Sequence, residues 1–422
     1  MEIDEVEKLT EKYKLLFKLL GAAALGRDSV TDEKFDSEII DIARKNGVLG
    51  LIISELKKCY DTGILEASQE QLDSVIFDLS SRITGYSKKQ YAVNEVVKKL
   101  ENIGISCVML KGDTLGVMYR NPDFRMSNDT DILIDKKDER KCFKFFKSEN
   151  SYIKKRTASN NQSVVVHPKG GVFEIHISMD TKQISEVWYD NIDFVQEPYR
   201  EVTVAGMYTY KTLGYTDNAI NLMLHFIKHF VGGIAHVRMM TDTVLYFEAY
   251  HDKIDFTRFW KTMKHLKYEH IAESLMYIGN CYFGFENINF KKEYKEFADK
   301  IISDIADCCE YGYSALEKKG GIYNLYSQKR YSTFMKDDYK RYQKKILVLD
   351  AFDLIFKNKY EMVKLYPVLE KHMYLLPFMY CHRAVNCILN TIFPKRKKAL
   401  IDETFDKLMD KRMKLIDELD MI

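Results

Sequence analysis

The chain has 422 residues, of which 46% are apolar and 13% aromatic, so it can bury the cores of two or three domains. Its 64 lysines and arginines nearly balance its 62 aspartates and glutamates, and the net charge of +2 excludes a global attraction to nucleic acid or anionic lipid. The eight cysteines are scattered without a CxxC pair, which disfavours structural zinc and indicates free thiols in a reducing cytosol.

The N-terminal region is predicted to be helical. Its first residues, MEIDEVEKLTEKYK, are acidic where an export signal would need a basic start and an apolar core, so no export is expected. Apolar residues spaced three and four apart predict helices over Val6–Leu20, Phe35–Leu56 and Gln69–Leu100. We therefore expect residues 1–103 to form a helical N-terminal region.

The pattern changes between residues 104 and 205. Short apolar and β-branched runs, with a strong turn signal at Pro168–Gly171, predict strands interrupted by two helices. The expected strands are Ser106–Leu110, Asp131–Ile134, Tyr152–Thr157, Ser163–His167 and Val172–Ile177, and the expected helices are Asp113–Tyr119 and Lys137–Glu149. We expect a compact α+β domain over residues 104–205, which is an ordinary domain size.

Helical spacing then returns, with breaks expected at Gly232-Gly233 and Gly320-Gly321. Residues 206–422 are therefore expected to form a helical C-terminal domain. The most apolar late stretch, Met373–Phe393, contains a proline and several polar side chains, so it is too polar to span a membrane. We expect a cytoplasmic protein without membrane contact.

Two aspartates, Asp129 and Asp131, stand one residue apart at the start of an apolar run that ends at Ile134. On a strand, residues i and i+2 point to the same face, so the two carboxylates would lie close together. Such a pair repels unless a cation lies between its members, and a divalent metal is the most economical one. The pair is a candidate Mg²⁺ site, and solvated turn residues beside a strand are the structural alternative.

Two further features extend this candidate site. Glu174 lies within the apolar strand VFEIHI, where it either points into a site or shares a polar outer face with His176. Upstream, the strand VMLKG ends in a turn at Lys111 and Gly112, where an ammonium and a close backbone could approach phosphate. Lys111 could equally cover the sheet with its aliphatic stem. Together these residues predict a site for a metal-bound nucleotide.

Three later features each allow two interpretations. His225 and His229, four apart on one helical face, have the spacing of a zinc pair, but no HExxH sequence and no third ligand at a suitable spacing accompany them. Histidines satisfied within a core or cleft are the alternative. Lys318–Lys345 interleaves tyrosines with basic residues, which suits nucleic-acid binding or a solvated surface. The basic run Lys395–Lys398 is either a binding patch or a solvated helix start.

The order of these motifs resembles the poorly characterised nucleotidyltransferase family within the DNA polymerase β-like superfamily. The resemblance rests on LKG at 110–112, YRNPDFR at 119–125, the aspartate pair, and the glutamate-hydrophobic-histidine strand at 174–176. It extends more loosely to LHFIKH at 224–229, Val237-Arg238 and Asp242, which resemble the family's HxxKH and R…D helices, and to Tyr366-Pro367, Leu376-Pro377 and Arg383 near the C-terminus.

The resemblance implies an α+β fold in which a small mixed-sheet nucleotidyltransferase palm is embedded between N- and C-terminal, mostly helical regions. It also implies a site for two Mg²⁺ ions and a nucleoside triphosphate. Asp129 and Asp131 would bind both ions, and Glu174 would either ligate the nearer ion or take the proton of the acceptor.

A set of nucleotide-binding residues follows from the same resemblance. Its members are Lys111, Gly112, Arg125, His225, Lys228, Arg238 and Asp242. Lys111 and Arg125 would bind the triphosphate, and Gly112 would permit close backbone approach. The last four residues of this set, His225 to Asp242, lie on expected helices and would line the cleft where the helical region closes over nucleotide or acceptor. The lysine-glycine turn departs from the superfamily's usual glycine-serine.

The implied activity is Mg²⁺-dependent transfer of a nucleoside monophosphate from a nucleoside triphosphate to an acceptor hydroxyl, with pyrophosphate leaving. A small-molecule acceptor fits the near-neutral charge, whereas a tRNA or protein acceptor would fit the tyrosine-rich basic segment. The alternative is a catalytically silent nucleotide-binding or scaffold protein. The three carboxylates count against this alternative, because carboxylates held together without a cation repel one another and a protein without catalysis gains nothing from them.

Overall fold

The computed structural model of the chain describes residues 3–27, 33–125, 127, 129–154, 162–168, 171–177, 179, 195–231, 235–311, 356, 362, 365–392 and 403–421. The basic segments Lys318–Lys345 and Lys395–Lys398, and both expected glycine breaks, lie outside these residues.

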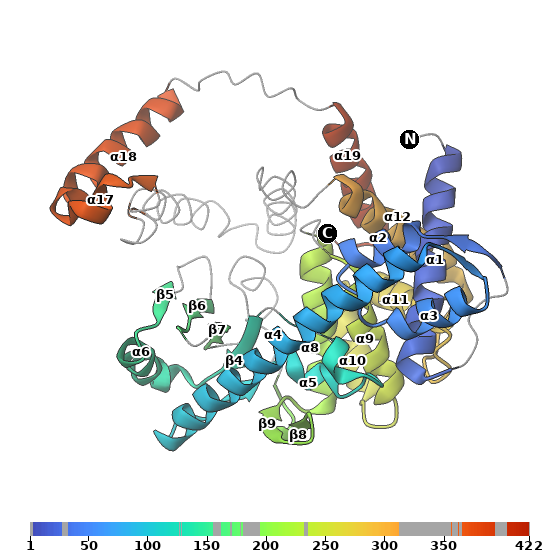
Figure 1. Cartoon of the computed structure of the whole chain (residues 1–422), viewed down its shortest axis with the longest axis horizontal. Coiled ribbons are helices and arrows are strands. Elements are labelled where there is room, and N and C mark those ends of the chain that lie inside the picture. The colour runs from blue at the N-terminus through green and yellow to red at the C-terminus, as the bar shows by residue number, and fades with distance from the viewer. Residues whose placement is uncertain are drawn as a thin grey trace.

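Helices precede and follow one mixed sheet along the chain, which confirms the expected α+β class (Figure 1). The N-terminal elements are α1 (Ile3–Leu25), β1 (Phe35–Asp36), α2 (Glu38–Lys45), α3 (Ile53–Asp61), β2 (Leu65–Glu66) and α4 (Gln69–Asn102). The later helices are α8 (Tyr215–Val231), α9 (Val237–Ala249), α10 (Phe256–His265), α11 (Glu269–Cys281), α12 (Lys295–Tyr311), α17 (Val368–Lys371), α18 (Leu376–Ile392) and α19 (Glu403–Glu418). Short 3-10 turns lie at Pro122–Phe124, Lys136–Asp138, Lys292–Tyr294 and Met373–Leu375.

Local sequence signals explain where the N-terminal helices begin and end. The helix α4 begins at a capping box, in which the Ser68 side chain accepts from the Gln71 backbone and the Gln71 side chain accepts from the Ser68 backbone. The single helix expected over Phe35–Leu56 is wrong, because α2 stops before Gly47, whose φ of 68° favours glycine and ends the helix.

The seven strands of the main sheet are ordered β5-β6-β7-β4-β3-β9-β8. They are β3 (Val108–Met109), β4 (Asp129–Leu133), β5 (Tyr152–Lys154), β6 (Gln162–Val166), β7 (Val172–His176), β8 (Arg200–Val204) and β9 (Tyr208–Thr212). The short helix α5 (Asp113–Gly116) follows β3, and α6 (Glu139–Ser148) follows β4. The two strands that carry the acidic residues, β4 and β7, are parallel neighbours near the centre of the sheet.

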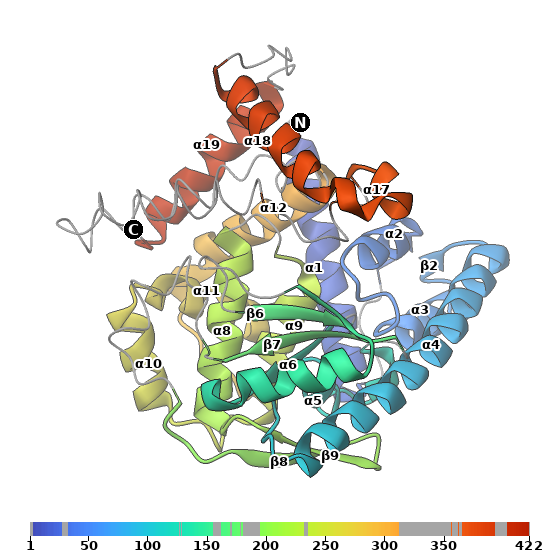
Figure 2. The same cartoon turned by 90° about the vertical axis from the view of Figure 1, so that its left-hand side faces the viewer.

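Alternation along β4 and β7 gives the sheet one apolar and one mixed face. Ile132, Phe173 and Ile175 point to the apolar face, where they pack with Phe146 of α6 and Val97 of α4 in one buried cluster. Figure 2 shows α6 lying across one side of the sheet. The intervening positions carry the aspartates, the glutamate and the histidine. The same alternation that fills the core therefore places every acidic side chain of these strands on the opposite face.

The strands β8 and β9 form a hairpin that we did not predict. Ala205 and Gly206 join them with φ values of 52° and 65°, and the flanking residues alternate between buried and exposed. The sheet therefore continues past residue 205, and we propose to place the end of the palm after Thr212.

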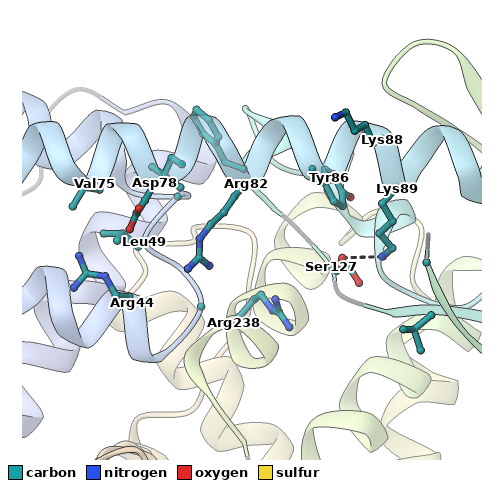
Figure 3. A pocket seen from close by; sticks show the side chains of 17 residues that line it. Arg44, Leu49, Val75, Asp78, Arg82, Tyr86, Lys88, Lys89, Ser127 and Arg238 are labelled. Atoms are coloured by element: carbon teal, nitrogen blue, oxygen red, sulfur yellow. Dashed lines mark hydrogen bonds between the residues drawn. The ribbon is translucent and has the colours of Figure 1, made fainter. Parts of the chain in front are cut away.

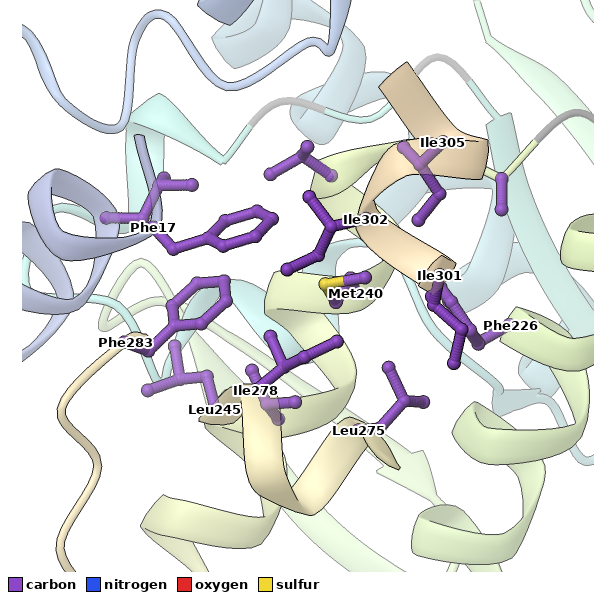
Figure 4. Close-up of a cluster of buried hydrophobic side chains, with 14 of the residues drawn as sticks. Phe17, Phe226, Met240, Leu245, Leu275, Ile278, Phe283, Ile301, Ile302 and Ile305 are labelled. Atoms are coloured by element: carbon purple, nitrogen blue, oxygen red, sulfur yellow. The ribbon is translucent and has the colours of Figure 1, made fainter. Parts of the chain in front are cut away.

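A large apolar core joins the helices of the two ends of the chain (Figure 4). Phe17 of α1 stacks on Phe283, with ring centroids 4.9 Å apart, and both contact the cluster formed by α8, α9, α11 and α12. Within the part of the chain that the structure describes, no helix is both long and apolar enough to cross a membrane.

Gly21 marks a very close contact in this core. A Cβ atom added there would lie 1.9 Å from the backbone oxygen of Phe283, so we expect Gly21→Ala to lower the free energy of unfolding by about 1–3 kcal/mol. Gly85→Ala in α4 is the matched control, because nothing lies within 4 Å of its added Cβ. This control should gain up to about 1 kcal/mol in chemical denaturation. Equal effects of the two substitutions would contradict this packing.

Candidate functional site

Asp131 and Glu174 lie side by side on two adjacent strands near the centre of the sheet. The parallel register places Asp131 of β4 beside Glu174 of β7, and His176 follows two residues later on the same face. Ligand atoms of these three side chains all lie within 4.8 Å of one another. The structure thus brings together two of the three predicted carboxylates, with a histidine that we had not included in the site.

Asp131 is almost completely buried, with 1% of its side chain exposed. Burial alone would raise its pKa, but Lys111 and His176 outweigh this effect and hold the pKa of Asp131 well below its usual range. The Lys111 Nζ lies 3.4 Å from Asp131 Oδ2, and His176 Nε2 lies 3.0 Å from Asp131 Oδ1. Asp131 is therefore an ionised, fixed carboxylate at neutral pH.

Glu174 behaves in the opposite way. Burial, followed by the nearby charge of Asp131, raises the pKa of Glu174 to about 7. This carboxyl exchanges its proton near neutral pH, whereas its neighbour stays charged. Two carboxyl groups with separated pKa values can divide the work of charge stabilisation and proton transfer.

Asp129 begins β4 and lies on the same face as Asp131, but it does not belong to the group of three donors. Its Oδ1 accepts a hydrogen bond from Ser127 Oγ at 3.2 Å. Lys89 of α4 donates to the backbone oxygens of both Ser127 and Asp129, at 2.8 Å each. The long helix α4 thus fixes the start of the strand that carries both aspartates.

The turn between β3 and α5 also depends on α4. Gly112 has a φ of 71° and a ψ of −117°, a conformation that requires glycine. Tyr86 of α4 donates to the buried Asp113 carboxylate immediately after this turn. Lys111 is directed at Asp131, whose Oδ2 lies 3.4 Å from its Nζ, and the same Nζ lies 3.4 Å from His225 Nε2. Its first role in this structure is therefore to compensate Asp131.

Cationic and neutral groups of α8 lie near the same face. Burial and the charge of Lys111 hold the pKa of His225 well below its usual range, and burial with Lys228 does the same for His229. The two imidazole rings lie 4.4 Å apart. Burial lowers the pKa of Lys228 to about 8. Within the described ranges, no group of three metal donors includes either histidine, which favours the cleft interpretation over a zinc pair.

Arg125 and Asp242 form a buried ion pair that our sequence prediction did not foresee. The guanidinium Nε donates to Asp242 Oδ1 at 3.0 Å and Nη2 donates to Oδ2, while Tyr119 donates to Oδ1 at 2.8 Å. Both charged side chains are less than 8% exposed. Because the donors of Arg125 that face Asp242 are engaged, we propose that this pair joins the palm to α9, and the nucleotide-binding role of both residues stays a prediction.

Arg238 lies one turn before Asp242 on α9 and lines a cavity of about 590 Å³ (Figure 3). The cavity also contains basic side chains of α2 and α4 that we did not predict as site residues, namely Arg44, Arg82, Lys88 and Lys89. Their signal in the sequence is the spacing of Arg82 and Lys89, seven residues apart on one face of a helix.

The donor chemistry of the acidic group fits a divalent cation. Two carboxylates on neighbouring strands suit Mg²⁺ or Mn²⁺, and the ammonium of Lys111 shows that a positive charge is stabilised beside Asp131. Imidazole suits transition metals better than Mg²⁺, so His176 is better placed as the group that orients Asp131. The residues present therefore fit the expected metal.

A family model described as an uncharacterised nucleotidyltransferase matches residues 33–284, which is more than half of the chain. The matched range contains the whole sheet, the acidic group, α4, α8 and α9. Neither the curated proteins nor the solved structures gave a significant match.

Proposed function

The chain belongs to the uncharacterised nucleotidyltransferase family, and we propose that it transfers a nucleoside monophosphate from a nucleoside triphosphate to an acceptor hydroxyl. The observation that carries this proposal is the pairing of Asp131 with Glu174 on adjacent strands, with His176 beside them. In the reaction, the acceptor oxygen bonds to the α-phosphorus, the bond to pyrophosphate breaks, and the hydroxyl proton passes to a base.

We assign the metal to Asp129, Asp131 and Glu174, with two Mg²⁺ ions as the expected set. Bound Mg²⁺ would supply charge neutralisation for the triphosphate and for the leaving pyrophosphate. Lys111 and His176 hold Asp131 ionised and oriented before any cation arrives. Glu174 either ligates an ion or takes the proton of the acceptor, for which a pKa of about 7 is suitable.

The acceptor that we favour is a small molecule in the cytoplasm. The near-neutral net charge gives no general attraction to RNA, and Cys59, Cys107, Cys142, Cys281 and Cys381 are free thiols, as expected in a reducing compartment. A tRNA or protein acceptor would draw its support from the tyrosine-rich basic segment.

The competing function is a nucleotide-binding or scaffold protein without catalysis. Thermal-shift measurements with Mg²⁺ and each nucleoside triphosphate test binding, and stabilisation should require both components. Incubation of the full chain with α-labelled triphosphates and fractionated lysate then tests transfer. Label on a small molecule, RNA or protein would identify the acceptor class. Stabilisation without any transferred label would favour the silent alternative.

The pKa of Glu174 predicts how metal binding depends on pH. Below pH 7 most molecules carry a proton on Glu174, and a cation must displace it, so affinity for Mg²⁺ should rise about tenfold between pH 6 and pH 8 and then level off. Isothermal titration of the metal-free protein measures this. Glu174→Gln should bind more weakly and lose most of the pH dependence. An affinity for Mg²⁺ that is flat over this range in the wild type would contradict the assignment.

A further inference from the structure

The basic cavity adjoins the acidic group through shared residues. Ser127 lines the cavity and hydrogen-bonds Asp129, and Val172, another lining residue, is the register partner of Asp129 on β7. Lys89 lines the cavity and donates to the backbone oxygen of Asp129 at 2.8 Å. A molecule held in the cavity would therefore lie next to the start of the strand that carries both aspartates.

The lining of the cavity carries a strong excess of positive charge. Among the described lining residues, Arg44, Arg82, Lys89 and Arg238 stand against a single acidic side chain, Asp78. Arg44, Arg82 and Arg238 come from three different elements, α2, α4 and α9. In Figure 3, Arg82 extends from α4 into the space between Arg44 and Arg238, whereas Lys88 is directed away from it. Basic groups brought together from separate elements repel one another, so this arrangement is costly unless an anion offsets it.

Two arginines of the cavity have few carboxylate partners. Among the residues that the structure describes, no ion pair includes Arg82, and the ion pair of Arg44 is with the exposed Asp41. Lys89 donates to backbone oxygens. Lys111, by contrast, is engaged at Asp131 and His225. The cationic capacity for binding a polyanion therefore lies in the cavity rather than at the lysine-glycine turn.

We propose that this cavity binds the polyphosphate of the nucleotide substrate, with Arg82 and Arg44 as principal contacts and Arg238 as a further lining residue. The proposal rests on the proposed function for the identity of the ligand. A triphosphate is the most highly charged group in that reaction, and guanidinium groups can bind its oxygens in pairs. The cavity volume of about 590 Å³ lies within the usual range for ligand pockets. The N-terminal helices would then be part of the substrate site.

Calorimetric titration of the full chain with inorganic tripolyphosphate and with each nucleoside triphosphate tests this inference. Arg82→Ala should weaken binding of tripolyphosphate and of the preferred nucleotide by roughly tenfold or more, and adding Arg44→Ala should weaken it further. Lys98→Ala removes the same charge from an exposed position elsewhere on α4 and should change affinity less than about twofold. The exposed Arg82 side chain predicts an unchanged melting temperature, which circular dichroism checks.

Two outcomes would overturn the inference. One is equal tripolyphosphate affinity in wild type and Arg82→Ala. The other is a failure of nucleoside triphosphate to compete with tripolyphosphate for binding. That result would mean that the cavity binds the phosphates of a different molecule. Asp131→Asn should retain tripolyphosphate binding in metal-free buffer. If wild type transfers no nucleotide while binding still depends on Arg82, the proposed function fails and the phosphate-binding role of the cavity stands.

Discussion

Asp131→Asn is expected to reduce nucleotidyl transfer by roughly a thousandfold while leaving the protein folded. The carboxylate is buried at the centre of the sheet, held ionised by Lys111 and His176, and paired with Glu174 on the next strand. Asparagine has nearly the same shape but cannot carry the negative charge that a divalent cation needs. Initial rates of transfer from a labelled triphosphate, together with a melting curve, measure both parts of the prediction.

Asp135→Asn is the matched control for this substitution. Asp135 follows the same strand, is 62% exposed and contacts only Lys137 among the ion pairs that the described residues form. Its replacement should leave the transfer rate within about twofold of wild type. Equal rates for Asp131→Asn and wild type would remove Asp131 from the proposed mechanism. A collapse of the melting transition would instead assign the residue a structural role.

Asp242→Ala is expected to lower the free energy of unfolding by about 3–5 kcal/mol. The substitution would leave the buried guanidinium of Arg125 without its carboxylate and would remove the acceptor of the Tyr119 hydroxyl. Both are costly, because neither group can recover its hydrogen bonds from water. Urea denaturation monitored by circular dichroism gives the change.

The control for this prediction is Asp61→Ala, which breaks the exposed pair with Lys57 on α3 and should cost less than about 1 kcal/mol. A similar small cost for Asp242→Ala would contradict a structural role for the buried pair. If that variant were stable but bound nucleoside triphosphate much more weakly, the result would support the nucleotide-binding role predicted for Arg125 and Asp242.

The acidic site was predictable because it follows from local periodicity. Asp129 and Asp131 precede an apolar run, and Glu174 interrupts another, so the two-residue repeat of a strand places them on the face that the core does not use. The same repeat applies to His176, which we noted as a neighbour of Glu174 but did not assign to the site. The β8–β9 hairpin could also have been predicted, because buried and exposed residues alternate on both sides of the Ala205-Gly206 turn.

The long-range pairings were not predictable in this way. Arg125 and Asp242 lie 117 residues apart, and no local pattern of either segment requires the other. Similarly, Arg44 and Arg82 each look like ordinary surface charges in their own helices, and only the fold brings them to one cavity with Arg238, which the resemblance had already suggested as a cleft residue. Side-chain roles that depend on packing between helices therefore needed the structure, whereas roles set by a single strand did not.

The position of a radioactive label in the products tests the central claim most directly. The full chain is incubated with Mg²⁺, acceptor-containing lysate fraction and the same triphosphate labelled either at the α- or at the γ-phosphorus. We predict that addition of the chain places α-label on the acceptor and that no γ-label follows it there, since the γ-phosphorus leaves with pyrophosphate. Transfer of γ-label to the acceptor that requires the chain and does not occur with the lysate fraction alone would show that the chain is not acting as a nucleotidyltransferase.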